Sequence, residues 1–288
     1  LIIFHPSSSP VADGRLTIEF LDVGQGDSTF ITFPNGETML IDGGGRVDYS
    51  VRSEEDEPFE PDAPRIGEMV VSEFLWEKGY SRVDRLVVSH ADADHSQGLT
   101  DTIRNFSVGE VILGSAPATD SEMDGLLTLA KLFSVPVRQV GRGESIHVGG
   151  AVRIDMLWPL PTSEPLGSDN NSSLVMRLIH GTNTFLFTGD IEQEAEAGLL
   201  AEGSVLRADV IKVPHHGSRT SSTKEFVDAV RPKLAIIPVG NRSMFGHPHL
   251  EVVERWRAAG AETRTTGRKG TLTVLSDGNS LDFTTFLP

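Results

Sequence analysis

The segment from Ser89 to His95, which reads SHADADH, holds the densest group of potential metal ligands in the chain. Two imidazoles and two carboxylates stand within six positions there, directly after the apolar stretch VDRLVVS, which predicts a buried strand. Neutral imidazole and carboxylate together suit Zn²⁺, Mn²⁺ or Fe²⁺. Outside a strand, a turn can fold this spacing back on itself, so that several side chains reach one point. The alternative, a polar loop with incidental histidines, accounts poorly for this density at a strand end.

Such a group of ligands is typical of two-metal hydrolysis. Two metal ions about 3.5–4 Å apart can activate a water molecule and hold both oxygens of an in-line displacement. Water bound to a strong Lewis acid has a pKa of about 7, so hydroxide is available near neutrality. The chain contains no cysteine, which excludes disulfides, zinc–thiolate sites and cysteine nucleophiles. These residues therefore favour phosphodiester cleavage.

The pattern H-x-D-x-D-H in residues 90–95 resembles the metal-binding H-x-H-x-D-H of the metallo-β-lactamase superfamily, with Asp92 in place of the second histidine. The rest of the chain agrees, because further short strings follow the order and spacing of one subgroup. That subgroup is the soluble domain of the competence protein ComEC and its stand-alone relatives, and the resemblance covers roughly residues 16–285. The strings are DVGQGDS (22–28), LIDGG (40–44), SHADADH (89–95), DNNSSL (169–174), FTGDIE (187–192), KVPHHGS (212–218) and GHPH (246–249).

This resemblance implies an α+β fold, the four-layer αββα metallo-β-lactamase sandwich, with two divalent metal ions at one edge of the two sheets. The implied ligands are His90 and Asp92 for the first ion, Asp94, His95 and His216 for the second, and Asp190 as the bridge between them. In the family pattern Asp94 also orients the attacking nucleophile, which makes it a catalytic candidate.

One position departs from the family pattern. The first metal site usually takes a further histidine, and no histidine stands at that place in this chain. The nearest candidates are Asp169, Asn170 and Asn171. The first site is therefore richer in oxygen, which shifts the expected metal from zinc toward manganese without excluding zinc.

Further polar residues are candidates for supporting the ligands or meeting the substrate. Asp42 should fix a metal-bound histidine through its free ring nitrogen; the alternative is a turn residue that caps the following glycines. His247 should contact substrate or donate a proton, because histidine titrates near neutrality; the alternative is a residue at a helix entry. His215 is assigned to the substrate side. The remaining candidates are Gln25, Asp27 and Ser28, in a glycine-bracketed turn that could meet an anion or be a tight turn only, and Ser218, whose hydroxyl suits phosphate.

The elements that position these residues follow from apolar periodicity. Strands alternating with helices predict two sheets covered by helices on the outside. The expected strands span 16–23, 28–33, 38–42, 83–89, 108–113, 137–140, 145–148, 151–158, 173–179, 184–188, 209–213, 234–239, 262–266, 271–275 and 281–285, and the expected helices 66–78, 97–105, 120–134, 191–201, 223–230 and 249–259. We expect an irregular lead-in over 1–15 and one domain over 16–288, interrupted by an acidic loop at 45–65. Because the chain starts at Leu1, we expect a processed chain or a piece of a longer one.

The charge of the chain limits how it could hold a polyanion. The formal net charge is −16, which makes the chain a poor general binder of nucleic acid. The distribution is uneven, since residues 201–288 carry a net charge of +3. Any contact with DNA would need local basic residues or metal ions. Arg264, Arg268 and Lys269 form one such group, and this basic turn predicts phosphate contacts; a solvated turn is an equal alternative.

The leading functional hypothesis is a metal-dependent phosphodiesterase, specifically a nuclease acting on single- or double-stranded DNA. In the ComEC family this domain is thought to degrade the DNA strand that is not imported. That resemblance implies the membrane channel portion of the same polypeptide as a partner, and the extracytoplasmic face of a bacterial membrane as the location. The acidic balance mildly favours an alternative, a hydrolase of small phosphoesters. A non-catalytic domain that retains the fold is a third hypothesis, against which the intact ligand set argues.

Overall fold

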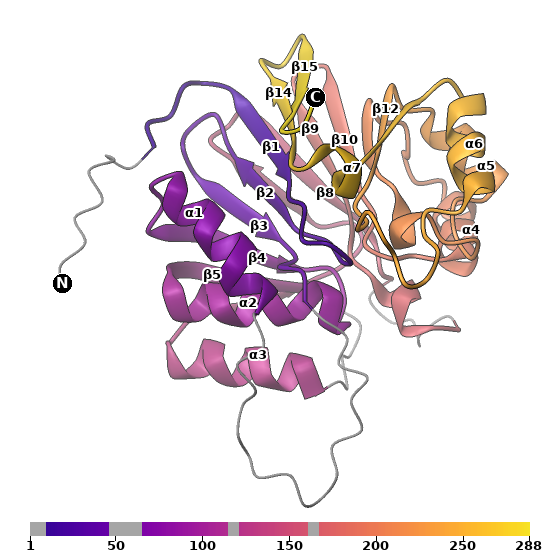
Figure 1. Ribbon diagram of the computed structural model, residues 1–288. Helices are drawn as coiled ribbons and strands as arrows, with labels where there is room; N and C mark the ends of the chain where they lie inside the picture. Colours follow the sequence, from indigo (N-terminus) through magenta and orange to yellow (C-terminus); the bar gives the residue numbers. More distant parts are fainter. Residues whose placement is uncertain (1–9, 46–64, 115–120, 161–166) are drawn as a thin grey trace, which may run out of the picture.

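Two β-sheets pack face to face in the centre of the molecule, and helices lie on their outer sides (Figure 1). The computed structural model describes residues 10–45, 65–114, 121–160 and 167–288. The first sheet is antiparallel from β15 to β3 and parallel from β3 to β6. Its strands, in spatial order, are β15 (Leu281–Thr285), β14 (Leu272–Ser276), β1 (Leu16–Phe20), β2 (Thr29–Thr32), β3 (Thr38–Ile41), β4 (Arg82–Val88), β5 (Ser107–Gly114) and β6 (Val137–Val140).

The second sheet has the same division into a parallel and an antiparallel part. Strands β13 to β10 are parallel neighbours, and β10 to β7 are antiparallel neighbours. The spatial order is β13 (Glu262–Thr265), β12 (Leu234–Ile237), β11 (Val210–Lys212), β10 (Asn183–Phe187), β9 (Val175–His180), β8 (Val152–Trp158) and β7 (Ser145–Val148). Each described strand from Leu16 onward therefore belongs to one of the two sheets.

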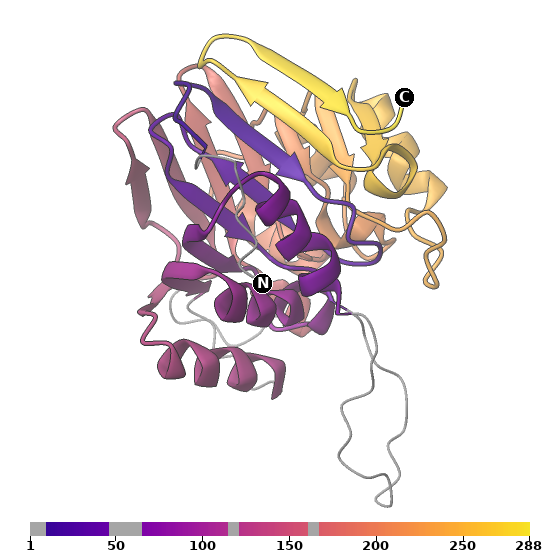
Figure 2. The same cartoon turned by 60° about the vertical axis from the view of Figure 1, so that its left-hand side comes forward.

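Three apolar layers hold the sandwich together. The middle layer lies between the sheets and includes Ile18, Ile31, Leu178 and Phe185, all essentially inaccessible to solvent. Each sheet also has one outer apolar layer, which lies between that sheet and its helices. Figure 2 shows the helices lying against the sheets. The helices over the first sheet are η1 (Gly67–Ser72), α1 (Glu73–Glu77), α2 (Ala93–Asn105) and α3 (Ser121–Leu132), and those over the second are α4 (Gln193–Ala201), α5 (Lys224–Val230) and α6 (Leu250–Ala258). The predicted four-layer αββα sandwich is confirmed.

The start of α2 differs from the expectation in a way that matters for the site. The sequence predicted a helix from about residue 97, whereas α2 begins at Ala93 and includes part of the SHADADH segment. The backbone N–H groups of His95 and Ser96 donate to the carbonyl of Asp92, which closes the first turn. Asp94 lies in that turn, where a carboxylate is favoured by the helix dipole. A helix turn rather than an irregular loop therefore carries Asp94 and His95.

Two other local differences are smaller. The helix expected at 66–78 is divided into the π-helical turn η1 and the short α1. The basic turn contains a short helix, α7 (Thr266–Lys269). Residues 1–9 of the expected lead-in and residues 46–64 of the acidic loop lie outside the described residues. Within the described ranges, none of the helices has the length and apolar character needed to cross a bilayer.

Candidate metal centre

The loops that follow parallel strands of both sheets converge on one site. Asp42 follows β3 and His90 follows β4 in the first sheet, while Asp190 follows β10 and His216 follows β11 in the second. His216 belongs to η3 (Pro214–Gly217), where it adopts a left-handed backbone conformation with φ 49°. The carboxyl ends of parallel strands are a common ligand-binding edge, since the chain leaves the sheet there. The strand order therefore brings Asp42 and His216, which are 174 positions apart in the chain, to one site.

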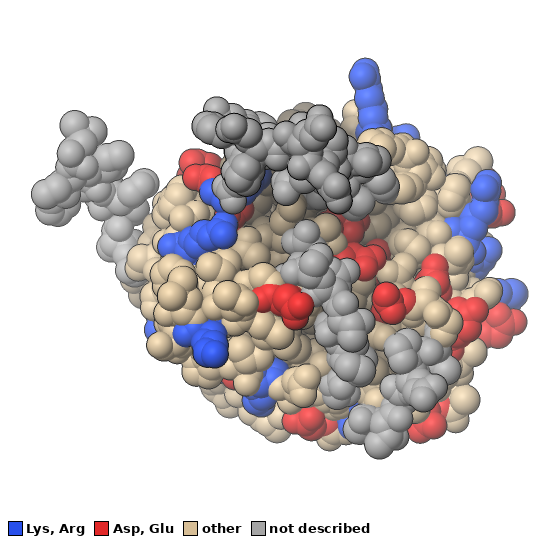
Figure 3. All heavy atoms as spheres, turned by 90° about the horizontal axis from the view of Figure 1, so that it is seen from below, with Lys and Arg blue, Asp and Glu red and all other residues tan. Residues whose placement is uncertain are grey.

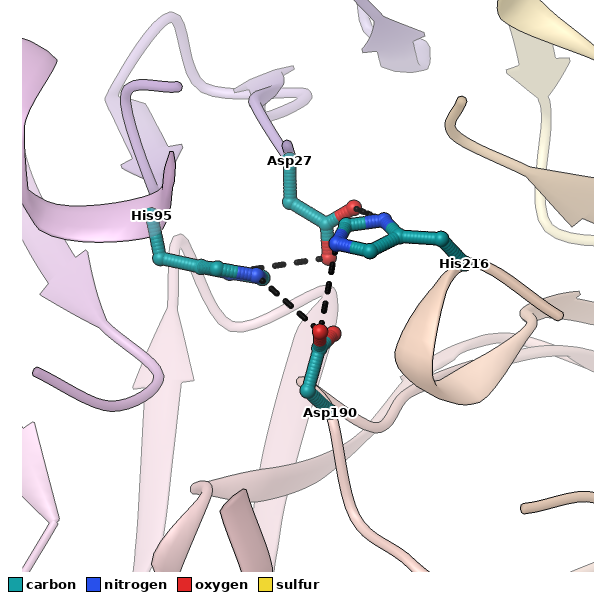
Figure 4. A group of neighbouring side chains, drawn as sticks. All are labelled: Asp27, His95, Asp190 and His216. Carbon is teal, nitrogen blue, oxygen red and sulfur yellow. Dashed lines mark ion pairs between the residues drawn. The ribbon is translucent and has the colours of Figure 1, made fainter. Parts of the chain in front are cut away.

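Four buried side chains form the centre of this site (Figure 4). Asp27, His95, Asp190 and His216 each offer one ligand atom, and these atoms lie within 4.8 Å of one another. Asp190 Oδ2 lies 3.3 Å from His95 Nε2 and 3.2 Å from His216 Nε2. Asp94 joins from the first turn of α2, with its Oδ2 at 3.4 Å from His216 Nε2. The predicted second-metal ligands are thus brought together around Asp190.

Three histidines share one arrangement, in which Nδ1 contacts a neighbouring group and Nε2 makes no hydrogen bond within the described chain. The Nδ1 atom of His90 lies 3.0 Å from Ser89 Oγ, that of His95 2.9 Å from Asp42 Oδ2, and that of His216 2.9 Å from the carbonyl of Pro238. The Nε2 atom of each of these rings is buried and has no hydrogen-bond partner among the described residues. An unpaired buried nitrogen is costly, whereas a ligating histidine characteristically has its other nitrogen held. These residues therefore fit divalent metal ions bound through Nε2.

His90 and Asp92 form the other half of the predicted constellation. Asp92 Oδ2 lies 3.5 Å from His90 Nε2, and the His90 and His95 ring centres are 4.1 Å apart. The proximity of His90 is the largest cause that lowers the pKa of Asp92. The pair lies beside the four-residue centre, where the His90 and His95 rings meet.

The electrostatics of the centre favour cations. Burial would raise the pKa of Asp190, but the neighbouring His216 and Lys212 hold it well below its usual range. Burial would likewise lower the pKa values of His95 and His216, but Asp190 and Asp27 raise both well above the ordinary value. The carboxylates thus stabilise positive charge at this point, whether it is carried by protons or by a metal ion.

Asp27 and Lys212 occupy the back of the centre. Asp27 contacts the Nδ1 side of the rings, at 3.3 Å from His216 and 3.7 Å from His95. Lys212 is buried at the end of β11, where Nζ donates to Asp190 Oδ1 at 3.0 Å and to the Gly189 carbonyl at 2.7 Å, and also pairs with Asp27. The sequence assigned Asp27 to substrate or to a supporting role, and its position behind the rings fits the supporting one. Lys212 was missed, although it opens the string KVPHHGS.

Asp27 reaches the centre because the β1–β2 turn lies directly on α2. Gly26 has a φ of 115°, and a Cβ atom there would stand 2.2 Å from the Asp94 carbonyl oxygen. The backbone N–H of Asp27 donates to that same oxygen at 3.2 Å. Only glycine allows this approach, so the turn has a positional function rather than an open anion-binding one.

Asp42 supports two of the histidines at once. Besides His95 Nδ1, its carboxylate accepts from the backbone N–H of Ser89 at 2.8 Å and from Ser89 Oγ at 2.7 Å. Ser89 Oγ in turn lies against His90 Nδ1. The geometry is that of the supporting carboxylate predicted from the sequence.

Asn171 does not have the position expected of a metal ligand. Its Oδ1 accepts from the N–H groups of Glu192 and Ala195, and its Nδ2 donates to Glu194. The side chain therefore caps the start of α4, whose N-terminal N–H groups need partners. Asp169 is exposed and Asn170 partly so, and in the part of the chain that the structure describes no hydrogen bond or ion pair joins their side chains to His90 or Asp92. Within the described residues, Asn171 therefore does not take the place of the missing histidine at the first site.

The remaining candidates lie around the centre rather than in it. His215 turns away from the ligands, with Nδ1 at 3.2 Å from both Glu192 Oε1 and Thr220 Oγ1. Ser218 Oγ pairs with Thr220 Oγ1 at 3.0 Å, and Ser28 Oγ donates to the Asp42 carbonyl at 3.1 Å. Gln25 Oε1 accepts from Ser243 Oγ. Ser28 and Gln25 are thus engaged in holding loops together.

His247 stands next to the centre. Its ring centre is 6.4 Å from that of His216 and 5.7 Å from that of His215, and its buried Nδ1 has no hydrogen-bond partner in the described chain. Burial, followed by the charges of His216 and His215, lowers the pKa of His247 to about 4. Without bound metal, the ring is therefore neutral near pH 7, and its predicted contact with substrate and its predicted role as proton donor both stay predictions.

One face of the molecule carries many acidic side chains. Figure 3 views the molecule from the lower side of Figure 1, and acidic side chains gather over the middle and right of that face while lysines and arginines lie nearer its margin. A polyanion approaching this side meets unfavourable charge unless cations are bound. This arrangement agrees with the formal net charge of −16.

An αββα sandwich with a buried histidine–carboxylate centre at one sheet edge defines a metallo-β-lactamase-type hydrolase with a site for divalent metal. The chain belongs to the metallo-beta-lactamase superfamily, whose family model matches residues 21–240. The solved metallo-beta-lactamase fold protein YhfI from Bacillus subtilis has the same fold, with a TM-score of 0.54 over 91% of this chain and 100% of that one, at 12% identity.

Longer proteins contain a similar segment. The chain is 31% identical to ComE operon protein 3 of Bacillus subtilis (strain 168) over 94% of its own length and 34% of that protein. It is 30% identical to competence protein ComA of Neisseria gonorrhoeae over 67% of its own length and 25% of that protein. The chain thus spans about a third or less of these relatives. The predicted superfamily and the resemblance to ComEC-type relatives are confirmed.

Proposed function

We propose that this domain is a metal-dependent phosphodiesterase that cleaves DNA. The observation that carries the proposal is the set of buried Nε2 atoms on His90, His95 and His216, which make no hydrogen bond within the described chain while each Nδ1 is held. Carboxylates surround these atoms, so the donor set combines nitrogen and oxygen. Such a mixed set suits Zn²⁺ or Mn²⁺, and the oxygen-rich first site favours Mn²⁺.

Two divalent ions would share this centre. Asp94, His95 and His216 would hold one, His90 and Asp92 the other, and Asp190 would contact both. When bound, these ions supply Lewis acidity and activated water for in-line displacement at phosphorus. The limited protein ligation of the first site leaves room for phosphate oxygens, which is a further reason to favour phosphodiesters.

Other functions at the site belong to residues that orient the ligands, hold the attacking water or contact the phosphate. Lys212 and Asp27 orient Asp190 and the backs of the histidine rings. The Asp94 side chain is 14% exposed, against 5% for Asp190 and 2% for His216, so Asp94 faces the accessible side and can hold the attacking water. The neutral ring of His247 can contact a phosphate oxygen through an N–H group.

The relatives support DNA as the substrate class. The name of the Neisseria relative, competence protein, places that protein in DNA uptake. We propose that the present domain serves the same process, degrades the strand that is not imported, and works beside a membrane channel on the extracytoplasmic face of a bacterial membrane. The acidic surface makes bound metal ions necessary for holding the polyanion.

Cleavage assays test this proposal directly. We expect the chain with Mn²⁺ to cleave single- or double-stranded DNA, and Asp94→Ala to lower the rate by about 100-fold or more. Asp228→Ala, which removes an exposed carboxylate of α5 paired with Lys224, is the matched control and should keep full activity. No cleavage by the parent chain, or equal cleavage by Asp94→Ala, would disprove the nuclease.

The acidic face favours one second candidate, a hydrolase of small phosphoesters. That enzyme would cleave a small chromogenic phosphodiester with Mn²⁺ and leave oligonucleotides intact. A domain without catalysis would bind less than one equivalent of metal after reconstitution, which metal analysis of the purified chain measures.

A further inference from the structure

A line of rings runs from the metal centre to the surface. The His247 ring lies 6.4 Å from His216, nearly parallel to it at an interplanar angle of 29°. The Phe245 ring follows at 5.9 Å from His247, tilted by 32°. Phe245 is 46% exposed. The outer face of this line is therefore open at its Phe245 end.

The loop that carries these rings is held in place. Ser243 Oγ donates to Gln25 Oε1 at 3.0 Å, which joins the loop to the β1–β2 turn. The backbone N–H of His249 donates to the Gly217 carbonyl at 3.0 Å, which joins it to the loop of His216. Both attachments lead to segments that carry residues of the metal centre. Phe245 thus has a defined position relative to the reacting phosphate.

From this geometry we infer that Phe245 is a stacking platform for an unpaired nucleobase of a single-stranded substrate, next to the scissile phosphate. The inference rests on the proposed phosphodiesterase function. Bases of a single strand can turn outward and stack on aromatic side chains without regard to sequence, whereas duplex bases already stack on one another. The unpartnered Nδ1 of His247 supplies a polar group between the phosphate and the base.

The surroundings of Phe245 fit this ligand. Arg242, in the same loop, is exposed and forms no ion pair within the described chain, so it is free to meet a backbone phosphate. Met244 is 80% exposed beside the ring and adds apolar surface. A cation and an aromatic face in one loop provide the two kinds of contact that bind single strands.

The test compares a normal strand with a strand of equal length whose sugars carry no bases. Phe245→Ala should raise the KM for the normal strand about 5- to 150-fold, the effect of losing one base stack, with little change in kcat. The same variant should leave the KM for the abasic strand unchanged. Phe245→Trp should restore binding of the normal strand. Phe133→Ala, which removes an equally exposed ring (50%) beyond α3, is the matched control.

Two results would overturn the platform. One is an unchanged KM of Phe245→Ala on the normal strand, and the other is an equal rise on both strands, which would assign the loop to backbone contacts. Quenching of 2-aminopurine in a single strand bound to the Asp94→Ala variant reports stacking without cleavage and should disappear on adding Phe245→Ala. If the parent chain cleaves neither strand with Mn²⁺, the nuclease proposal fails. If the parent chain cleaves DNA and Phe245→Ala has the same KM, only the stacking platform is contradicted.

Discussion

At the scale of single residues, Lys212 places a fixed positive charge among the carboxylates of the centre. Its side chain is 4% exposed and contacts Asp27 and Asp190, which lie on both sides of it. Replacing it by Met keeps the volume but leaves two buried carboxylates without their cation. Without metal, we expect Lys212→Met to lower the free energy of unfolding by about 3–5 kcal/mol. Saturating Mn²⁺ should remove much of this loss, because the ions supply the missing positive charge.

Urea unfolding in chelator and in Mn²⁺ measures both values. The matched control is Lys233→Met, which breaks a pair with Asp209 in which the lysine is 76% exposed. That change should cost less than about 1 kcal/mol, with or without metal. A loss from Lys212→Met that is the same in chelator and in Mn²⁺ would mean that Lys212 contributes packing rather than charge compensation.

At the scale of elements, two glycines in helices should respond to alanine with opposite signs. Gly98 lies inside α2, and a Cβ atom there would stand 2.0 Å from the Gly43 carbonyl oxygen. We expect Gly98→Ala to destabilise the protein by about 1–3 kcal/mol, because the loop after β3 must move away from α2. Metal affinity should fall as well, since that loop and α2 carry Asp42 and His95. Thermal unfolding and metal titration measure the two effects.

Gly125 in α3 is the matched comparison, because it is exposed and a Cβ atom there would have no neighbour within 4 Å. Gly125→Ala should stabilise the protein by up to about 1 kcal/mol, the difference in helix propensity, and leave metal binding unchanged. If both alanines stabilise, the close approach of α2 to the β3 loop is not a constraint on the fold.

At the scale of the whole molecule, a chain with net charge −16 would have to hold DNA, the proposed substrate, through a few local cations or bound metal ions. Arg268 is exposed at α7, and the neighbouring Gly267 N–H donates to the Val239 carbonyl at the base of the Phe245 loop. In an Asp94→Ala background, we expect Arg268→Ala to reduce the slope of log affinity against log salt by about 0.9 on duplex DNA or 0.7 on a single strand. The loss should be uniform across sequences, because phosphate contacts carry no base information.

A salt titration of DNA binding measures this slope. Lys131→Ala, which removes a cation from the last turn of α3 on the outer helix layer, should leave it unchanged. An unchanged slope for Arg268→Ala would assign the basic turn to solvent.

Local patterns in the chain determined the identity of the elements and of most ligands. Runs of apolar residues marked the strands of both sheets, because central strands such as β3 and β12 are buried on both faces, between the other sheet and the helices. The SHADADH segment and the strings around Asp190 and His216 marked the candidate metal ligands, because few other functions require imidazole and carboxylate at that density. The helix start at Ala93 was misjudged, since Asp94 and His95 fit both a turn and a first helical turn.

Only the tertiary structure decided how these residues face one another. In the sequence, Lys212 is one residue of a buried strand and Asp27 is part of a turn. Their contact with each other becomes evident only in the fold, where β11 and the β1–β2 turn meet behind the histidine rings. Asn171 was available as a ligand in the sequence, but α4 uses its side chain as a cap. Phe245 joins the centre through His247 in the same way. Spacing along the chain describes only near neighbours, whereas these contacts depend on which strand ends meet at one edge of two sheets.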